Sequence, residues 1–584
     1  MQERWDLDVL YTSLHSEKFK KHFKEFKEYV VKLNDLSKNY VGVVDYSKVD
    51  EYIELQSKIS DFFTLFTYVE LTLSVESNNV DFIKMLDVLE NIHADLHIPE
   101  VRFAKYISTV NIEDLVTSSE NLKEHSFYLK KIFNNSKYML ENSAEEVIAK
   151  LKMTGSGSFE KLRDQLIANL IVDFELDGKE SVNFSTIRNC AYSEDSSIRK
   201  NAYFAELNAF KKVDTSLAAA LNSIKGEVIT ISEKRGYSSP LEKTVIDSRM
   251  DMETLKVMNC AIEASIPKLQ KYFIKKAEIL GRKNGLPFYD LFAPVGKNMT
   301  FTYEEAAKYI INSFGKFNNE LSDFAKHAFE NRWIDATPML GKRDGAFCQN
   351  IQQIKESRIL SNFSGSFGDV STLAHELGHG FHGYCLNGEK ILNTNYPMPI
   401  AETASIFCET IIEEEALKNA SEEEMKFILD NTLTNATQIV IDVYSRFLFE
   451  DELFKRRKEA TLSVGELCTI METAQQKTYG AGLDKNTMHK YMWAGKPHYY
   501  SADYNYYNFP YIFGLLFAKG VYAIYKEKPE GFINIYKELL SNTGKDNLYN
   551  VAKSVGIDIH DINFWKKSLK TIEKDVEKFV ALGV

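Results

Sequence analysis

Proline and glycine are scarce in this chain. Its 584 residues include 11 prolines and 28 glycines, both below their usual shares, and this favours long helices over a turn-rich, all-β architecture. Six cysteines lie far apart without any CxxC pair, a pattern typical of a reduced, cytoplasmic protein. Because no run of about 18 apolar residues is unbroken, we expect no membrane span.

Positive charge is also in short supply. Lys and Arg number 71 against 83 Asp and Glu, which gives a formal net charge of -12. A chain of this sign repels a phosphate backbone, and no local basic patch offsets the repulsion, so we expect no nucleic-acid partner. The first residues, MQERWDLDVLYTSLHSEKF, lack the apolar core of a signal peptide, in keeping with a cytoplasmic location. The sequence leaves the oligomeric state open.

Helical periodicity is abundant instead. Lys, Glu, Leu and Phe recur at helical spacing from residue 16 to about 150, which predicts three or four long helices. Residues 167–190 alternate apolar and polar around Asp177 and Gly178, which predicts a hairpin joining an N-terminal helical domain (1–183) to a catalytic domain (184–584). A second strand-like island spans 345–365. We therefore expect a mainly α protein with small β islands.

Residues His375-Glu376-Leu377-Gly378-His379 spell H-E-x-x-H. Histidines four apart on a helix lie about 40° apart around its axis, so both imidazoles can face one ion. Glu376 projects about 100° from the first histidine, which places it beside a water at the metal. The composition predicts this pattern by chance only about 0.03 times in such a chain. The alternative is an amphipathic helix with two solvated histidines.

A catalytic zinc ion takes three protein ligands, so a third is needed. The metzincin pattern would require glycine at position 382 and histidine at 385, where this chain has His382 and Cys385. The remaining common option is a glutamate on a later helix, and we assign Glu402. Glu409 and Glu413 share its helix face; Glu409 is a candidate to orient a ligand imidazole, and a solvated acidic face is the alternative for both.

Two further histidine patterns are expected to be structural. His93 and His97 are also four apart, but no glutamate follows the first. His382 lies one turn from His379 and is expected to pack or to donate a hydrogen bond rather than to bind metal.

Tyrosine is concentrated near the end of the chain. Seven of the 31 tyrosines lie between positions 491 and 511, in YMWAGKPHYYSADYNYYNFPYIFG. Such a cluster often packs in a core or an interface. In a loop punctuated by Gly and Pro, however, His498, Tyr504 and Tyr511 could converge as donors to an oxyanion.

The segments HELGH, IAETASIF around Glu402 and PHYYSADYNYYNFPYIFG together resemble the thimet oligopeptidase and oligoendopeptidase F family of zinc peptidases, with oligoendopeptidase F the nearer branch. WDLDVLY and RWIDATPMLGKRDGAF extend the resemblance over nearly the whole chain. It implies a clam-like helical body with a deep substrate channel, and short unstructured oligopeptides as substrates. It also implies roles for individual residues: one Zn²⁺ held by His375, His379 and Glu402, Glu376 as the base, and substrate and oxyanion contacts from His498, Tyr504 and Tyr511, with Tyr506 or Tyr507 as alternatives to Tyr504.

We therefore expect a zinc-dependent endopeptidase. Two imidazoles and one carboxylate favour zinc, although metal supply also decides which ion is bound. One alternative is a carboxypeptidase or dipeptidyl carboxypeptidase, which needs a cationic group near the metal that the sequence does not single out. The other is a non-catalytic peptide-binding or scaffold protein. The 345–365 island is a candidate to pair with a substrate backbone as an edge strand.

Overall fold

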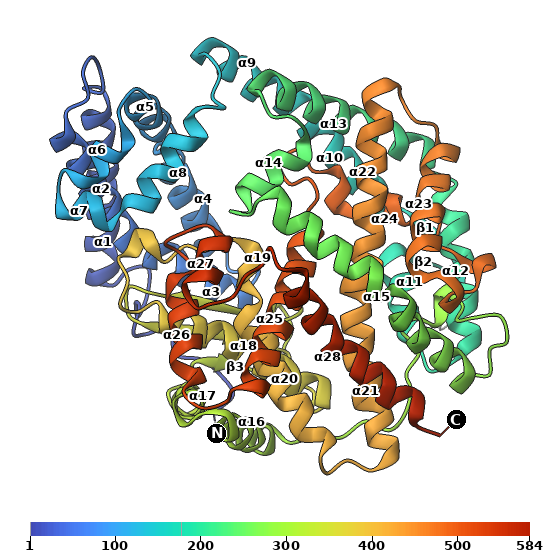
Figure 1. The fold of residues 1–584 in the computed structure, drawn as a ribbon. Helices are drawn as coiled ribbons and strands as arrows, with labels where there is room; N and C mark the ends of the chain where they lie inside the picture. Colours follow the sequence, from blue (N-terminus) through green and yellow to red (C-terminus); the bar gives the residue numbers. More distant parts are fainter. Residues whose placement is uncertain (1, 177, 584) are drawn as a thin grey trace.

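The computed structural model describes residues 2–176 and 178–583. Helix accounts for 69% of the chain and strand for 5%, so the prediction of a mainly α protein with small β islands is confirmed (Figure 1). Within the described ranges, no helix is both long enough and apolar enough to cross a bilayer.

The N-terminal helices form a lobe with its own hydrophobic core, drawn in blue at the left of Figure 1. The sequence predicted three or four long helices, whereas the structure divides the segment into nine, because capping side chains such as Asp45, Asn79, Asn111 and Ser119 begin new helices. They are α1 (Glu17–Ser37), α2 (Tyr46–Asp61), α3 (Thr64–Val75), α4 (Val80–Ala94), α5 (His97–Ile107), α6 (Ile112–Thr117), α7 (Glu120–Glu124), α8 (Ser126–Ser136) and α9 (Asn142–Thr154). No residue of α9 is buried.

The predicted hairpin is present. β1 (Ile171–Leu176) and β2 (Lys179–Asn183) pair antiparallel, with Val172 opposite Val182. Asp177, which the prediction placed in the turn, lies outside the described residues. The two valines pack on the larger core of the molecule, and the domain boundary between residues 183 and 184 stays a prediction.

The larger core is built by the remaining helices. Its first half contains α10 (Ser156–Ala168), α11 (Phe184–Asn189), α12 (Ser196–Phe210), α13 (Asp214–Arg235), α14 (Pro240–Asp247), α15 (Met252–Ile279), α16 (Tyr303–Phe317) and α17 (Asn319–Glu330). Its second half contains α18 (Phe367–Cys385), α19 (Met398–Ala401), α20 (Thr403–Leu417), α21 (Glu422–Thr437), the π-helical turn η4 (Gln438–Val443), α22 (Tyr444–Glu459), α23 (Val464–Tyr479), α24 (Met492–Gly495), α25 (Phe509–Glu527), α26 (Phe532–Asn542), α27 (Leu548–Ser554) and α28 (Ile562–Ala581).

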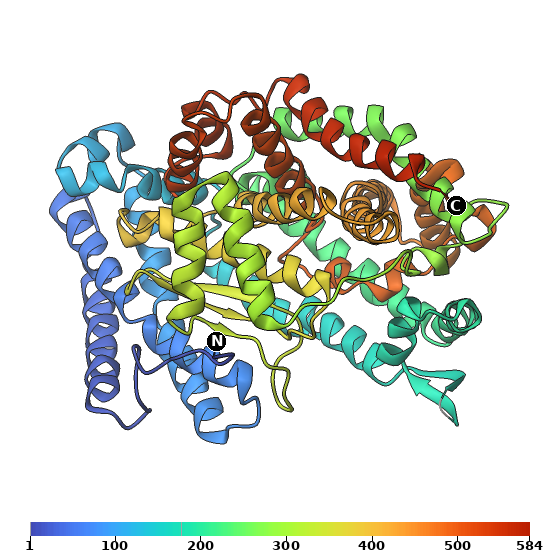
Figure 2. The same cartoon turned by 90° about the horizontal axis from the view of Figure 1, so that it is seen from below.

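A three-stranded sheet occupies the second predicted β island. β4 (Phe347–Ile351) pairs antiparallel with β5 (Glu356–Leu360), and β5 pairs parallel with β3 (Ile334–Asp335), in the order β3-β5-β4. The sheet packs against α18, and Figure 2 shows it in yellow-green beside the paired helices α16 and α17. Ile351 and Leu360 belong to the N-terminal core, so this sheet joins the two cores beside α18.

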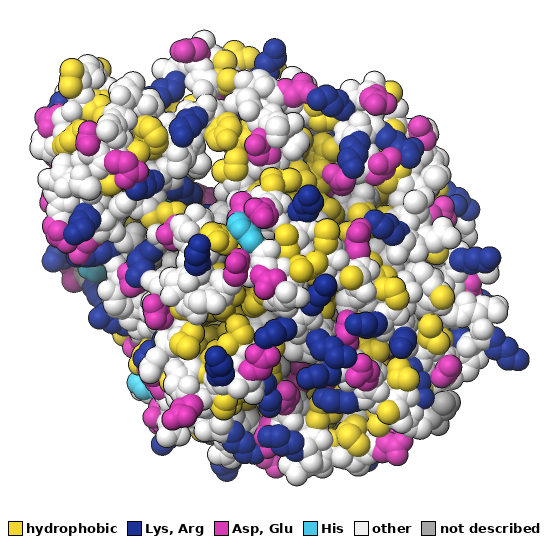
Figure 3. Space-filling view, viewed as in Figure 1, with side chains coloured by type: hydrophobic (Ala, Val, Ile, Leu, Met, Phe, Trp, Pro, Cys, Tyr) yellow, Lys and Arg dark blue, Asp and Glu magenta, His cyan; other side chains and the backbone are white. Residues whose placement is uncertain are grey.

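The surface is hollowed where the N-terminal lobe faces α14 and α27 (Figure 3). A cavity of about 660 Å³ lies there, lined by residues of α7, α8, α14 and α27. The two parts of the molecule therefore leave open space between them, in keeping with the expected clam-like body.

Candidate metal centre and active site

The H-E-x-x-H motif lies on α18, as the sequence predicts. Ser366 caps the helix and forms a capping box with Asp369, which fixes where the helix begins. Leu373, Leu377 and Phe381 are fully buried on one face. This packing leaves His375 and His379 together on another face, toward α20.

Gly378 sets the crossing of α18 and α20. A Cβ atom added to this glycine would lie 2.5 Å from the carbonyl oxygen of Ala404 and 2.6 Å from the Cα of Ser405. Only glycine lets the two backbones approach so closely. The crossing places Glu402, the N-cap residue of α20, opposite the two histidines.

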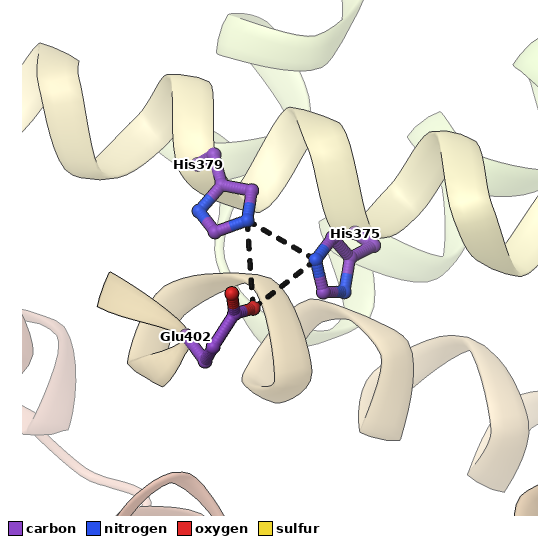
Figure 4. Close-up of side chains that lie close together, drawn as sticks. All are labelled: His375, His379 and Glu402. Atoms are coloured by element: carbon purple, nitrogen blue, oxygen red, sulfur yellow. Dashed lines mark hydrogen bonds and ion pairs between the residues drawn. The ribbon is translucent and has the colours of Figure 1, made fainter. Parts of the chain in front are cut away.

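The three predicted ligands converge (Figure 4). His375 Nε2 and His379 Nε2 lie 3.1 Å apart, and Glu402 Oε2 lies 3.2 Å from the first and 3.5 Å from the second. A tetrahedral zinc ion at about 2.0–2.1 Å from each ligand holds the ligand atoms about 3.3 Å apart. The donor set therefore fits such an ion, and it is the only group of three or more metal-binding side chains found within residues 2–176 and 178–583.

Neighbouring polar groups orient these ligands. Glu409 Oε1 lies 2.6 Å from His375 Nδ1, and a proton on this nitrogen leaves the lone pair of Nε2 facing Glu402. Ser405 Oγ donates to Glu402 Oε2 at 2.9 Å. Asn350 Nδ2, on β4, donates to the His379 carbonyl at 3.0 Å.

The acidic groups of the site titrate differently. Burial acts to raise the pKa of Glu402, but its hydrogen bond to His375 and the charges of both histidines lower it to about 2. Glu376 is 6% exposed, and burial, against the opposing charge of His375, raises its pKa to about 7. Glu402 is therefore ionised at neutral pH, as a carboxylate that binds a metal must be. Glu376, in contrast, can both accept and release a proton near neutral pH.

Glu413 does not belong to a solvated face. It is 9% exposed, it lies 3.6 Å from Lys519 Nζ, and burial raises its pKa to about 7. The solvated acidic face considered for Glu409 and Glu413 is therefore absent, because Glu409 contacts His375 and Glu413 faces a buried lysine.

Tyr511 lines the same cavity as two of the predicted metal ligands. With His375 and Glu402 it lines a cavity of about 370 Å³. Tyr511 occupies the first turn of α25, and burial raises the pKa of its hydroxyl, which stays a protonated donor.

His498 and Tyr504 lie outside that lining. The ring of His498 stacks on Tyr507 at 5.6 Å, and Tyr507 meets Tyr511 edge to face at 5.7 Å. Tyr504 also contacts Tyr507 and is 66% exposed. A chain of rings thus connects His498 and Tyr504 to the cavity through Tyr507, whereas Tyr506 is buried against Phe447 and Phe454.

The histidines expected to be structural have other neighbours. His93 packs against Phe63 and Phe66. His382 is fully buried, stacks on Tyr396 at 4.0 Å, and lies with Nε2 2.9 Å from Thr543 Oγ1.

Ser405 and Asn350 belong to the site but were not predicted from the sequence. Ser405 is three residues from Glu402, a helical-neighbour spacing that could have identified it. Asn350 reaches His379 from a strand 29 residues away, and no local pattern signals that contact. Tyr507, by contrast, was already named as an alternative to Tyr504, and the structure adds its ring contacts with His498 and Tyr511.

Comparison with known proteins decides the family. A family model described as Peptidase family M3 matches residues 189–571, and one described as Oligopeptidase F matches residues 106–171. The chain belongs to peptidase family M3.

Individual relatives agree with this assignment. Oligopeptidase PepF of Bacillus subtilis is 22% identical over 593 residues, covering 100% of this chain and 87% of the relative. An oligoendopeptidase F homolog of Borreliella burgdorferi is 24% identical over 604 residues, covering 98% of each. Among solved structures, oligoendopeptidase-F from Enterococcus faecium superposes with a TM-score of 0.71 at 18% identity, covering 96% of this chain and 99% of that one. At this identity the structural likeness shows the fold alone.

Membership in family M3 confirms the expected resemblance and the enzyme class. The protein is a metalloendopeptidase of an oligopeptide-hydrolysing, metal-dependent family.

Proposed function

We propose that this M3-family protein hydrolyses peptide bonds in short, unstructured oligopeptides with one zinc ion held by His375, His379 and Glu402. The convergence of three ligand atoms, 3.1, 3.2 and 3.5 Å apart, carries this proposal. Two imidazoles and one carboxylate with a fourth position open are the donor set of catalytic zinc. When bound, zinc supplies Lewis-acid chemistry that polarises a carbonyl and lowers the pKa of water.

Glu376 is the proposed general base. It adjoins His375 on α18, and its pKa of about 7 lets it take a proton from the attacking water and release it to the leaving amine. Because this carboxyl group is buried, bulk water does not solvate it and lower its pKa. In this scheme Glu376 holds the proton from the attack of the water until the departure of the amine.

Tyr511 is the proposed donor to the oxyanion. Its place in the lining of the cavity with His375 and Glu402 supports this role, and a fixed donor at a developing negative charge typically contributes about 10²–10³ in rate. His498 and Tyr504 are proposed to contact the substrate, and the ring contacts that link them to Tyr511 through Tyr507 support this role.

Short, extended substrates fit the shape of the site. A cavity of about 370 Å³ admits a few residues of extended chain and no folded domain. β4 is the edge strand of its sheet and contacts α18, so its outer edge is proposed to pair with substrate backbone.

Hydrolysis of quenched fluorescent peptides tests this function. Wild-type protein is expected to cleave them, whereas chelator-treated protein and Glu376→Gln are expected to be inactive, and metal analysis should find one zinc ion per chain in wild type and in Glu376→Gln. Equal cleavage by all three samples would refute the proposal and leave the non-catalytic alternative. Mass spectra of the products separate internal cleavage from removal of one or two terminal residues.

A cytoplasmic location and the absence of a nucleic-acid partner stay predictions. They rest on the scattered cysteines and on the net charge of -12. Fractionation of the cells that make the protein, and a filter-binding assay with labelled DNA and RNA, measure the two directly.

A further inference from the structure

A small cationic pocket adjoins the proposed active site. It has a volume of about 60 Å³, and its charged lining consists of Arg188, Arg199, Arg446 and Lys496 against Glu206 and Asp442. Arg188, Arg199 and Arg446 are paired with Glu206, Asp290 and Asp442, respectively, which leaves one positive group in excess. Such a local excess attracts an anion.

Lys496 supplies the uncompensated charge. Its amine makes no hydrogen bond or ion pair with any described residue, whereas Arg188 is bound to Glu206 at 2.9 Å and Arg199 to Asp290 at 2.8 Å. Burial, together with the charges of Arg446 and Arg188, lowers the pKa of Lys496 to about 7. An incoming anion would offset this repulsion.

Arg446 has spare hydrogen-bonding capacity as well. Its Nη2 is paired with Asp442, and its Nε is buried without an acceptor among the described residues. Asp442 also accepts a hydrogen bond from Tyr479 at 3.1 Å, so its charge is shared. A guanidinium with free N–H groups suits the planar, two-oxygen geometry of a carboxylate.

The pocket and the active-site cavity share a lining residue on η4. Gln438, the first residue of this π-helical turn, lines both the cationic pocket and the cavity that holds His375 and Glu402. The charge of Arg446 also acts on the hydroxyl of Tyr511 and on the imidazole of His498. π-Helical turns occur frequently at functional sites, where they redirect side chains.

From this arrangement we propose that Arg446 and Lys496 form a subsite that binds a carboxylate of the peptide substrate. The inference rests on the proposed function, because the carboxylate belongs to the peptide that the active-site cavity is proposed to bind. A cavity of about 60 Å³ exceeds the roughly 10–15 Å³ that a single water needs on the same measure, so it has room for a carboxylate group. The carboxylate is either the C-terminus of the substrate or the side chain of an Asp or Glu.

Peptide binding to zinc-loaded Glu376→Gln protein tests the subsite without turnover. Four labelled versions of one peptide are compared by fluorescence anisotropy: free acid or C-terminal amide, each with an internal Glu or Gln. We expect loss of the recognised carboxylate to weaken binding about tenfold or more, as for a hydrogen bond to a charged group. Dependence on the terminus identifies a chain-end site, and dependence on the internal Glu identifies a side-chain site; both support the proposal.

Variants then assign the effect to the pocket. Added to Glu376→Gln, Lys496→Met is expected to abolish the preference for the carboxylate while leaving the Kd of the uncharged peptide unchanged, and Lys496→Arg is expected to restore the preference. Lys485→Met, at an exposed lysine of the same segment, is the matched control and should retain it.

The proposal is overturned if all four peptides bind alike, or if Lys496→Met weakens every peptide equally. Failure of the proposed function is a separate result. In that case, wild-type protein would hydrolyse none of the four peptides, whatever their binding constants.

Discussion

The proposed active site has two halves of different construction. The helical half, on α18 and α20, holds His375, His379 and Glu402 at 22%, 17% and 19% side-chain exposure with hydrogen bonds around them. The aromatic half, residues 491–511, presents Tyr504 at 66% exposure and connects to the cavity through ring contacts. The difference teaches that the proposed metal ligands are preorganised by backbone packing, whereas the proposed substrate contacts in the second half belong to a segment that mixes buried rings such as Tyr506 with the exposed Tyr504.

The strongest test of the helical half removes one of its ligands. His379→Ala is expected to lose the metal and all detectable hydrolysis, because two remaining ligands hold zinc poorly. Metal analysis after dialysis and peptide hydrolysis measure both. The double variant His93→Ala/His97→Ala is the matched control, and an equal loss of metal from it would contradict the ligand assignment.

In the aromatic half, Tyr511 and Tyr504 are expected to differ. Tyr511→Phe removes a donor beside the metal group and should lower kcat by about 10²–10³. Tyr504→Phe should lower kcat far less, because its ring lies outside the cavity lining. Steady-state kinetics on one peptide compare them, and equal losses of kcat would contradict this difference between the two tyrosines.

Gly378→Ala tests whether helix packing preorganises the ligands. The new Cβ meets the backbone of α20 at 2.5 Å, so α20 must shift and move Glu402, and activity should fall about 10²-fold. Gly388→Ala is the control, because nothing lies within 4 Å of its Cβ position. Thermal unfolding and kinetics separate a shift from unfolding, and full activity of Gly378→Ala would break the argument.

Glu409→Gln should have a smaller effect. It removes the negative partner of His375 Nδ1 while keeping its shape, and a loss of about 10–100-fold in metal affinity or activity is typical for such partners. Competition with a chelator measures the affinity. Unchanged affinity and kcat would show that packing alone orients His375.

Acidification should lower the free energy of unfolding, because it protonates a buried carboxylate next to the aromatic half. Glu206, on α12, is 3.2 Å from His489 Nε2 and 2.9 Å from Arg188; burial opposes ionisation, but these two groups lower its pKa to about 2. Since the unfolded value is about 4.3, the stabilisation of up to about 3 kcal/mol is present above that pH and is lost as pH falls toward 2.

Urea unfolding at pH 7, 4 and 3 measures this dependence. Glu206→Gln should be less stable than wild type at pH 7 and should lose less stability on acidification. Parallel pH profiles for the two proteins would contradict the role of this carboxylate.

Local patterns predicted the helical half well. The spacing of His375, Glu376 and His379 is a property of a single helix, and the periodicity around it indicates which face is buried. The hairpin and the three-stranded sheet could also be predicted as β structure, because the alternation of apolar and polar residues is a local pattern. The division of the N-terminal segment into nine helices was missed, because several of them begin at a single capping side chain, such as Asp45 or Asn79, within a continuous apolar pattern.

The sequence by itself determined the helical character, the metal-binding motif and the family resemblance, since all three depend on residues close together in the chain. Tertiary structure decided that α20 crosses α18 at Gly378, that Tyr507 links the aromatic rings, and that Arg446 and Lys496 share a pocket. The first and the third are contacts between segments tens of residues apart, fixed by backbone packing and by the balance of charges. The rings around Tyr507 are close in the chain, but the irregular path of their loop decides which of them touch, and no local spacing encodes that path.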